Sequence, residues 1–279
     1  MNFLQSDLTY RLSRTLTWST LSALLLTTAL PPVQAAREMS TDRPDATESP
    51  FTVEPSRVQV EMSLVSYERD RHNPERDGTQ IDVWNVAPFN IRIGLTPAWE
   101  LQLVADSYLD VKVENRSENY RVRQRGIGDL TLRVKYNVWG NDGGESAFGI
   151  MPFVKLPTAS DDLGNDSVEG GVIFAYGSSL NETWGFGAMT EIDRVRNDAD
   201  DGYDWVWLNT VTVGRDLTER LGMFLELTLE TGPGKPALGF NTGTTYAVTE
   251  DFQLDLGLNF GLTRAAPDFG AFMGMSRRF

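Results

Sequence analysis

Hydrophobic and polar residues alternate along most of the chain after residue 57. In residues 58–64 and again in residues 130–138, every second side chain is apolar and the side chains between are polar. Such alternation predicts strands with one apolar face. We find about twelve such segments of about nine to thirteen residues, a length with which a tilted strand crosses a bilayer. In residues 203–215 the apolar face is ambiguous.

The predicted connections between these segments are of two kinds, which alternate. Tight turns rich in Asn, Asp, Gly and Pro are expected at residues 96–98, 141–144, 181–183, 216–220 and 249–251. On the other side, longer and charged connections are expected at residues 67–79, 113–126, 157–167 and 196–203. Shorter connections on that side are expected at residues 231–236 and 264–268. Short turns on one side and longer loops on the other are typical of outer-membrane barrels, with both termini on the periplasmic side.

The sequence therefore predicts an all-β protein, a transmembrane antiparallel up-and-down β-barrel of about 12 strands. Its aromatic girdles are expected at Trp99, Trp139, Trp184 and Phe252 on one rim, and at Tyr67, Tyr203 and Phe269 on the other. The alternative is a soluble β-sandwich or lipocalin-like barrel. It would bury the apolar face and leave the polar series outside; we favour the membrane barrel because the polar series is too charged for a dry core.

The N-terminus differs from the rest of the chain. Arg11 and Arg14 precede an apolar run that ends at Leu30, and small residues follow. We expect residues 1–35 to be a signal peptide, cleaved after Ala35 or Ala36; an uncleaved membrane anchor is the alternative. Residues 36–56 contain several prolines and are expected to form an extended periplasmic segment before a barrel at residues 57–279.

Composition limits the function classes. The formal charge is −14, and loss of the signal peptide, which has one acidic and two basic residues, makes it one unit more negative. Nucleic acid is therefore not expected as a partner. The chain has no Cys, so neither a lipid-anchored cysteine nor a disulfide is available.

With the apolar side chains facing lipid, the polar series should line a pore. The predicted pore-lining residues are Arg92, Gln102, Asp106, Asp110, Arg121, Arg123, Arg125, Asp129, Arg133, Lys135, Lys155, Glu169, Glu191, Glu226 and Asp255. Acidic residues near 100–110 and basic residues near 121–135 lie on hairpin neighbours, which predicts a ladder of ion pairs. Such a ladder either creates a field that selects solutes or props and closes the lumen, and we prefer the second reading because other carboxylates also face inward.

Catalytic chemistry is not expected. The only histidine, His72, lies in a predicted loop, where a solvated side chain is a better interpretation than a partner of a nucleophile. Asp198, Asp200, Asp201 and Asp204 resemble half of a calcium loop but lack its distant glutamate, so they form only a weak candidate site. We predict no cofactor and no other metal site.

Several motifs of the mature chain resemble one known family. They include residues 40–45 (STDRPD), 84–88 (WNVAP), 152–158 (PFVKLPT) and 164–171 (GNDSVEGG). These motifs resemble the bacterial outer-membrane transporter family named for the MetA pathway of phenol degradation, across essentially the whole mature chain. The resemblance implies a porin-like barrel in the Gram-negative outer membrane that passes small molecules, aromatic or other hydrophobic compounds among them. A non-conducting structural or binding barrel, with its lumen closed by the charge ladder and plugged by the N-terminal segment at residues 37–56, is the alternative.

The remaining expectations concern partners. A barrel in this membrane would contact outer-membrane lipid and lipopolysaccharide, and it would take up small-molecule solutes. The terminal Phe279, in alternation with Met275 and Met273, resembles the signal that the barrel assembly machinery reads. Arg277 departs from that pattern, which prefers an apolar or aromatic residue there.

Overall fold

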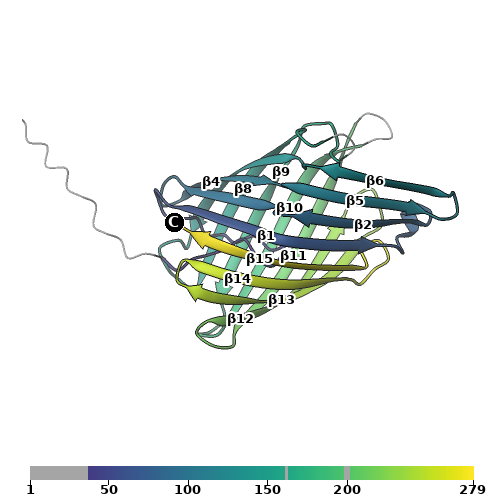
Figure 1. Ribbon diagram of the computed structural model, residues 1–279. Helices are drawn as coiled ribbons and strands as arrows, with labels where there is room; N and C mark the ends of the chain where they lie inside the picture. The colour runs from purple at the N-terminus through teal and green to yellow at the C-terminus, as the bar shows by residue number, and fades with distance from the viewer. Residues whose placement is uncertain (1–36, 161–162, 198–201) are drawn as a thin grey trace, which may run out of the picture. The chain divides into compact units, whose positions relative to one another are not determined.

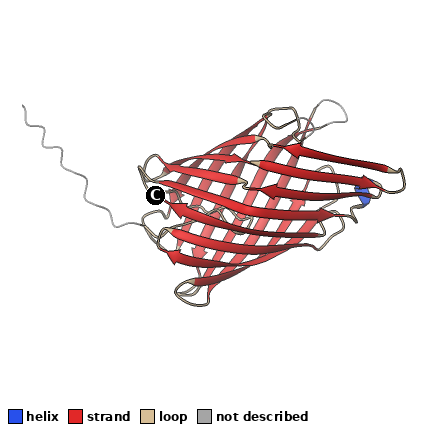
Figure 2. Cartoon of the chain, in the orientation of Figure 1, coloured by secondary structure: helices blue, strands red, loops and turns tan. Residues whose placement is uncertain are grey.

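The computed structural model describes residues 37–160, 163–197 and 202–279. The predicted signal peptide and three carboxylates of the calcium candidate, Asp198, Asp200 and Asp201, lie outside these ranges. The described residues form strands almost throughout, with one short 3-10 helix, η1 (Pro74–Arg76) (Figure 2). Within these ranges, no helix has the length and apolar character needed to cross a membrane.

The strands follow one another around a single sheet (Figure 1). They are β1 (Val58–Asp70), β2 (Thr79–Val86), β3 (Phe89–Gly94), β4 (Trp99–Ala105), β5 (Tyr108–Asn115), β6 (Tyr120–Gly126), β7 (Leu130–Trp139), β8 (Ser146–Leu156), β9 (Glu169–Ser179), β10 (Trp184–Arg196), β11 (Tyr203–Asp216), β12 (Leu221–Thr231), β13 (Ala237–Thr249), β14 (Phe252–Gly261) and β15 (Phe269–Arg278).

Three pairs of consecutive strands are interrupted halves of one longer strand. The first half of β1 pairs with β3 and its second half with β2, so β2 and β3 together form one neighbour of β1. In the same way β4 and β5 run along β3 and β2, and β7 and β6 run along β4 and β5. Pairing of β15 with β1 closes the sheet. The predicted antiparallel barrel of about twelve strands is therefore confirmed.

The expected turns occur at one end of the barrel, which we call the turn end; the opposite end is the loop end. Four of the five short connections of the turn end lie between β3 and β4, β9 and β10, β11 and β12, and β13 and β14. The fifth joins β7 and β8. At the loop end two connections are shorter than expected. The predicted loop at 113–126 is instead mostly strand, because β5 and β6 form a hairpin whose turn is residues 116–119, and β1 extends to Asp70.

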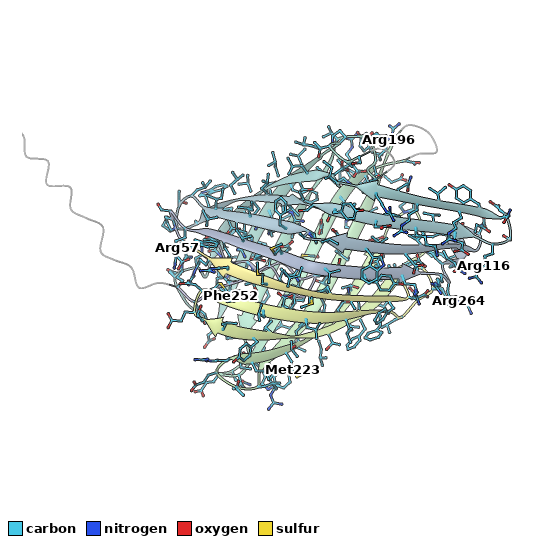
Figure 3. The ribbon with its side chains drawn as sticks, in the orientation of Figure 1. Arg57, Arg116, Arg196, Met223, Phe252 and Arg264 are labelled. Carbon is cyan, nitrogen blue, oxygen red and sulfur yellow. The ribbon has the colours of Figure 1, made fainter. Side chains whose placement is uncertain are left out.

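Apolar side chains cover the outer face of the barrel wall. On β14 they alternate with inward polar residues, and Leu256 is 55% exposed whereas Asp255 is buried. On β11, whose facing was ambiguous, Trp205 and Trp207 point outward while Thr210 and Thr212 are buried. Met223 of β12 and Phe252 of β14 also lie on the outer surface (Figure 3). Such a wall is suited to lipid outside and a polar lumen inside.

Aromatic side chains gather at both rims. At the turn end Trp99, Trp139 and Trp184 are exposed, as expected, and Trp99 packs on Tyr136 with ring centroids 4.5 Å apart. At the loop end Tyr67 packs on Trp84, 4.7 Å between centroids. Trp84, Tyr108, Trp205 and Trp207 add exposed rings to that rim that the sequence prediction omitted.

Within β1 to β7, the alternating series of residues that faces the lumen at the turn end is not the series that faces it at the loop end. Directly opposed residues of antiparallel strands point to the same side. Val83 opposes Glu68 and Val111, and Val83 and Glu68 both line an internal cavity. The neighbouring series, in which Asp82 opposes Arg69 and Lys112, must therefore point outward.

This change in facing takes place where the strands are interrupted. The register of β1 shifts between Ser63 and Val65, and Ala87, between β2 and β3, has a positive φ of 54°. Residues 106–107 separate β4 from β5, and residues 127–129 separate β6 from β7. One extra residue in a strand reverses the facing of all residues beyond it. At the loop end, the sheet formed by β2, β5 and β6 consequently has its apolar face inward and its charged face outward.

The last strand of this sheet has one open edge. Among the described residues, β6 pairs with β5 alone, whereas β7 pairs with both β4 and β8. The β5–β6 hairpin reaches farther from the C-terminus than the other strands (Figure 1). It is thus the most protruding part of the wall at the loop end.

Candidate functional site

The N-terminal segment, residues 37–56, lies within the barrel and contacts the inner face of its strands. The Nζ of Lys135 is 2.6 Å from Asp42 Oδ1, Arg43 Nη2 is 2.6 Å from Asp255 Oδ1, and the backbone N–H of Thr47 donates to Glu226. We expected an extended periplasmic segment; these contacts agree instead with the plug of the lumen that belongs to the non-conducting alternative. Its prolines keep the segment out of the sheet, while its carboxylates and backbone groups match the polar lumen.

At the centre of these contacts is a buried cluster of charges. Arg92 is fully buried and pairs with Glu61 and Glu100, in each case with 2.8 Å between nitrogen and oxygen. Asp42, from the segment, lies between Arg92 and Lys135. Charges this deep are tolerated only when they are paired, because removing one partner leaves the other uncompensated. The cluster therefore holds the segment against β3, β4 and β7.

The protonation of Asp42 follows from its surroundings. Burial by itself would raise the pKa of this carboxyl, but Arg92 and Lys135 outweigh burial and lower the pKa to about 2. Asp42 is thus charged at neutral pH, as its position between two cations requires.

Further contacts fix the segment along its length. Arg133 pairs with Glu48, and the Thr47 hydroxyl lies 2.7 Å from that of Thr210. At the turn end, Arg278 of β15 contacts Glu54 at 3.0 Å. Gly94 permits a close approach of the segment, since a Cβ there would lie 2.0 Å from the carbonyl oxygen of Glu54.

The structure brings many of the predicted pore-lining residues to the lumen. Six of them contact the N-terminal segment or lie in its cluster: Arg92, Gln102, Arg133, Lys135, Glu226 and Asp255. Five more occupy inward positions of the wall: Asp106, Asp129, Lys155, Glu169 and Glu191. Lys155 pairs with both Asp129 and Glu169 near the loop end.

Four predicted pore residues are not in the lumen. Asp110, Arg121, Arg123 and Arg125 lie on the outer face of the β5–β6 hairpin, in the series that includes Asp82 and Lys112. Asp110 does pair with Arg123 and Arg125, at 2.6 and 3.0 Å, so the expected ion pairs exist on the opposite side of the wall. The interruption before β5 and the one after β6 account for the difference.

The sequence prediction missed the partners that the N-terminal segment supplies, above all Asp42 and Glu48. The signal for them was present in the acidic residues of 42–54, which have no role in an extended linker. An alternating pattern predicts which way a side chain faces only within a strand, so it could not predict where the side chains of this segment point.

Between the segment and the wall there is unfilled space. One cavity of about 310 Å³ lies next to Arg43, and its other lining residues include Phe272, Val83, Asn85 and Asn259. A second cavity of about 170 Å³ shares Glu68 and Asn259 with it. The apolar inner face of β2 and β5 continues from Val83 through Val111 toward the loop end. The lumen thus offers an aromatic ring, aliphatic groups and amides to a small molecule.

The catalytic candidate and the calcium candidate both belong to the loop end. His72 is 72% exposed and its Nδ1 lies 2.9 Å from Asp268 Oδ1, an arrangement that matches a solvated loop histidine. Of the calcium candidate only Asp204, in β11, is described. In the described ranges no three His, Cys, Asp or Glu side chains form a group that could hold a metal.

A closed antiparallel barrel with an apolar outer wall and a polar lumen defines an outer-membrane type of β-barrel. The chain belongs to the family described as "Putative MetA-pathway of phenol degradation", which it matches over residues 41–279. This confirms the resemblance found in the sequence motifs. No curated protein matches the chain.

Solved structures share the fold. The COG4313 outer membrane channel from Pseudomonas putida F1 is 15% identical, with a TM-score of 0.62 over 86% of this chain and 100% of that one. The β domain of the Bordetella autotransporter BrkA is 12% identical, with a TM-score of 0.54 over 81% and 100% of the two chains. The NanC porin is 12% identical, with a TM-score of 0.50 over 79% and 98%. At these identities the likeness concerns the fold.

Proposed function

We propose that the protein is an outer-membrane channel through which small solutes, aromatic or other hydrophobic compounds among them, pass by diffusion. The observation that carries the proposal is the cavity of about 310 Å³ beside Arg43, where Phe272 and Val83 face amide groups inside the lumen. In this proposal the barrel lies in the outer membrane, with the turn end toward the periplasm and the loop end outside, the orientation typical of such barrels. The family description and the channel among the similar structures support this proposal.

Passage requires the N-terminal segment to move. The segment occupies the lumen between the cavity and the turn end, and polar contacts such as Lys135–Asp42 and Arg43–Asp255 hold it there. The proposed channel is therefore gated by residues 37–56.

A non-conducting barrel is the second candidate. The buried cluster around Arg92 favours it, because breaking several buried ion pairs to open a path costs several kcal/mol. In that case the barrel would bind a solute in the cavity without passing it.

Planar-bilayer recording separates the two candidates. The full mature chain and a variant lacking residues 37–56 are compared, and both are first checked for a folded barrel by heat-dependent migration on a gel. We expect small conductance steps from the full chain and larger ones from the deletion variant. A folded deletion variant that gives no steps contradicts the channel.

Liposome swelling then tests selectivity. Neutral, anionic and aromatic solutes of similar size are supplied to vesicles that contain the protein. The proposal predicts the fastest entry for aromatic solutes, and Phe272→Ala should reduce that preference while leaving the entry of sugars unchanged. Equal rates for all three classes would contradict a hydrophobic substrate.

A further inference from the structure

The outward face of β1, β2, β5 and β6 carries three carboxylates, and each is shared by two basic side chains. Asp82 lies 3.0 Å from Arg69 and 3.3 Å from Arg71. Asp110 is shared by Arg123 and Arg125, and Glu114 by Lys112 and Arg116. We call the seven basic residues of this face the outer basic patch: Arg69, Arg71, Lys112, Arg116, Arg121, Arg123 and Arg125.

The outer basic patch holds more positive than negative charge. Each carboxylate can neutralise only one of its two partners, and Arg121 contacts no carboxylate within 4.0 Å among the described residues. The turn adds one further carboxylate, Glu118, which does not balance the excess. This accumulation stands out in a chain whose formal charge is −14.

The depth of the patch relative to the lipid can be read from the strand register. Trp84 opposes Tyr67 and Asp110, and Asp110 opposes Arg125, so the aromatic rim and Arg125 share one row. Asp82, Lys112 and Arg123 occupy the next outward-facing row, two residues farther from the membrane. At about 3.3 Å per residue and with tilted strands, that step is roughly 5–7 Å. Since the aromatic rim marks the edge of the hydrocarbon, the patch lies at the level of the lipid headgroups.

The basic groups at this depth are accessible. The side chain of Arg123 is 55% exposed and that of Arg125 is 50% exposed. Arg116 lies at the tip of the protruding hairpin (Figure 3), and the free edge of β6 runs beside Arg121 and Arg123. An arginine in such a position can donate two N–H groups to two oxygens of one phosphate, while another of its N–H groups stays bonded to the carboxylate.

We propose that the outer basic patch binds the phosphate groups of the lipid that forms the outer leaflet, the lipid A part of lipopolysaccharide. Charge complementarity carries this assignment, together with the position of the patch in the row of the aromatic rim and in the rows beyond it. It rests on the proposed orientation, with the loop end outside, but not on conduction through the lumen. The expected role is to anchor the β5–β6 hairpin, whose β6 edge has no neighbouring strand, against the membrane surface.

Native mass spectrometry of the full mature chain in detergent tests the proposal, with lipid A carrying two phosphates as the probe. The test variant is Arg121→Glu/Arg123→Glu/Arg125→Glu. The matched control reverses three basic residues of the turn end, Arg215→Glu/Arg220→Glu/Arg277→Glu. Binding of lipid A should fall at least about tenfold in the test variant and change little in the control. Removal of both phosphates from lipid A should weaken its binding to the unmodified chain to a similar degree.

Several outcomes would overturn the proposal. These are equal loss in both variants, equal binding of dephosphorylated lipid A, or equal binding of phosphatidylglycerol. Because charge reversal could impair folding, heat-dependent gel migration is measured in parallel, and Arg121→Gln/Arg123→Gln/Arg125→Gln serves as a milder replacement. Orientation is tested separately by labelling Ser117→Cys on intact cells with a membrane-impermeant reagent; absence of labelling overturns the assignment to the outer leaflet. Loss of conductance without loss of lipid A binding would affect only the proposed channel.

Discussion

Two groups of ion pairs come from neighbouring strands of the first half of the barrel but lie on opposite faces of the wall. In the lumen, Arg92 joins Glu61 and Glu100, and all three side chains are fully buried. On the outer face of the β5–β6 hairpin, Arg123 and Arg125 share Asp110 and are half exposed. Both groups consist of arginines and carboxylates that meet across a ladder, so their composition does not distinguish them. Their surroundings determine what each contributes to the barrel.

The buried group fixes one arrangement, since none of its charges can lose a partner without a large cost. The exposed group is solvated, and its pairs can exchange a carboxylate for another anion at little cost. The first is suited to holding a segment in a lumen. The second is suited to contact with a charged surface.

The largest expected effect comes from breaking the buried group. Arg92→Ala leaves Glu61 and Glu100 buried without their cation and should lower the free energy of unfolding by about 3–5 kcal/mol. Arg123→Ala, the matched change in the exposed group, should cost at most about 1 kcal/mol. Urea unfolding followed by tryptophan fluorescence in lipid or detergent measures both. Similar losses in the two variants would show that the burial difference does not govern the stability.

A smaller effect is expected from Asp42→Asn, which removes one charge from the segment rather than from the wall. Lys135 loses its carboxylate partner, so the free energy that holds the segment in the lumen should fall by about 1–3 kcal/mol. The segment should therefore leave the lumen more often. Digestion with proteinase K at neutral pH, followed by mass analysis of the segment, reports this release. Asp45→Asn is the control within the same segment, and equal digestion of the two variants would remove Asp42 from the anchoring contacts.

The pH dependence of the same contact has a defined sign. The folded pKa of Asp42 is lowered to about 2, below the unfolded value of about 4, so its contribution is complete above about pH 4 and is lost as the pH falls through 2. Pepsin, which is active in this range, should release the segment increasingly between pH 4 and pH 2. The Asp42→Asn variant should lack this component of the pH dependence.

An effect of similar size to that of Asp42→Asn is expected from a steric change at the closest approach of the segment. Gly94→Ala places a methyl group against the carbonyl oxygen of Glu54 and should displace the segment at a cost of about 1–3 kcal/mol, shared with local adjustment. Gly185→Ala is the matched control, because a Cβ there meets no atom within 4 Å. The chain has no Cys, so Ser49→Cys provides a unique thiol, and its labelling rate measures displacement. Faster labelling should follow from Gly94→Ala alone.

The sequence predicts the fold because alternation and turn chemistry repeat in every hairpin. The facing of Arg92, Gln102, Arg133 and Lys135 follows from the same alternation, since no interruption separates these residues from the apolar strands beside them. Successive side chains of a strand face opposite sides of the wall, however, so one extra residue reverses the facing of every residue after it. Ala87, which precedes Pro88, and residues 106–107 are such irregularities; their residue types indicate an interruption but not how many residues it adds.

A plug of the lumen by the N-terminal segment was among the alternatives, but its individual contacts could not be predicted, for a different reason. Its contacts, such as Asp42 with Lys135 and Arg43 with Asp255, join residues 93 and 212 positions apart. They form only after the barrel has created a polar interior. Local sequence patterns predict strands and turns, but they do not predict which side chains fill the lumen that the strands enclose.

Arg278 ties the order of events during biogenesis to the final state of the lumen. Its side chain, on β15, contacts Glu54 and donates to the carbonyl oxygen of Arg37. Because β15 is also the strand that closes the ring on β1, this anchor is absent until the ring is complete. A nascent barrel with an open seam therefore holds its N-terminal segment less firmly than a finished one, and seating of that segment records that closure has taken place.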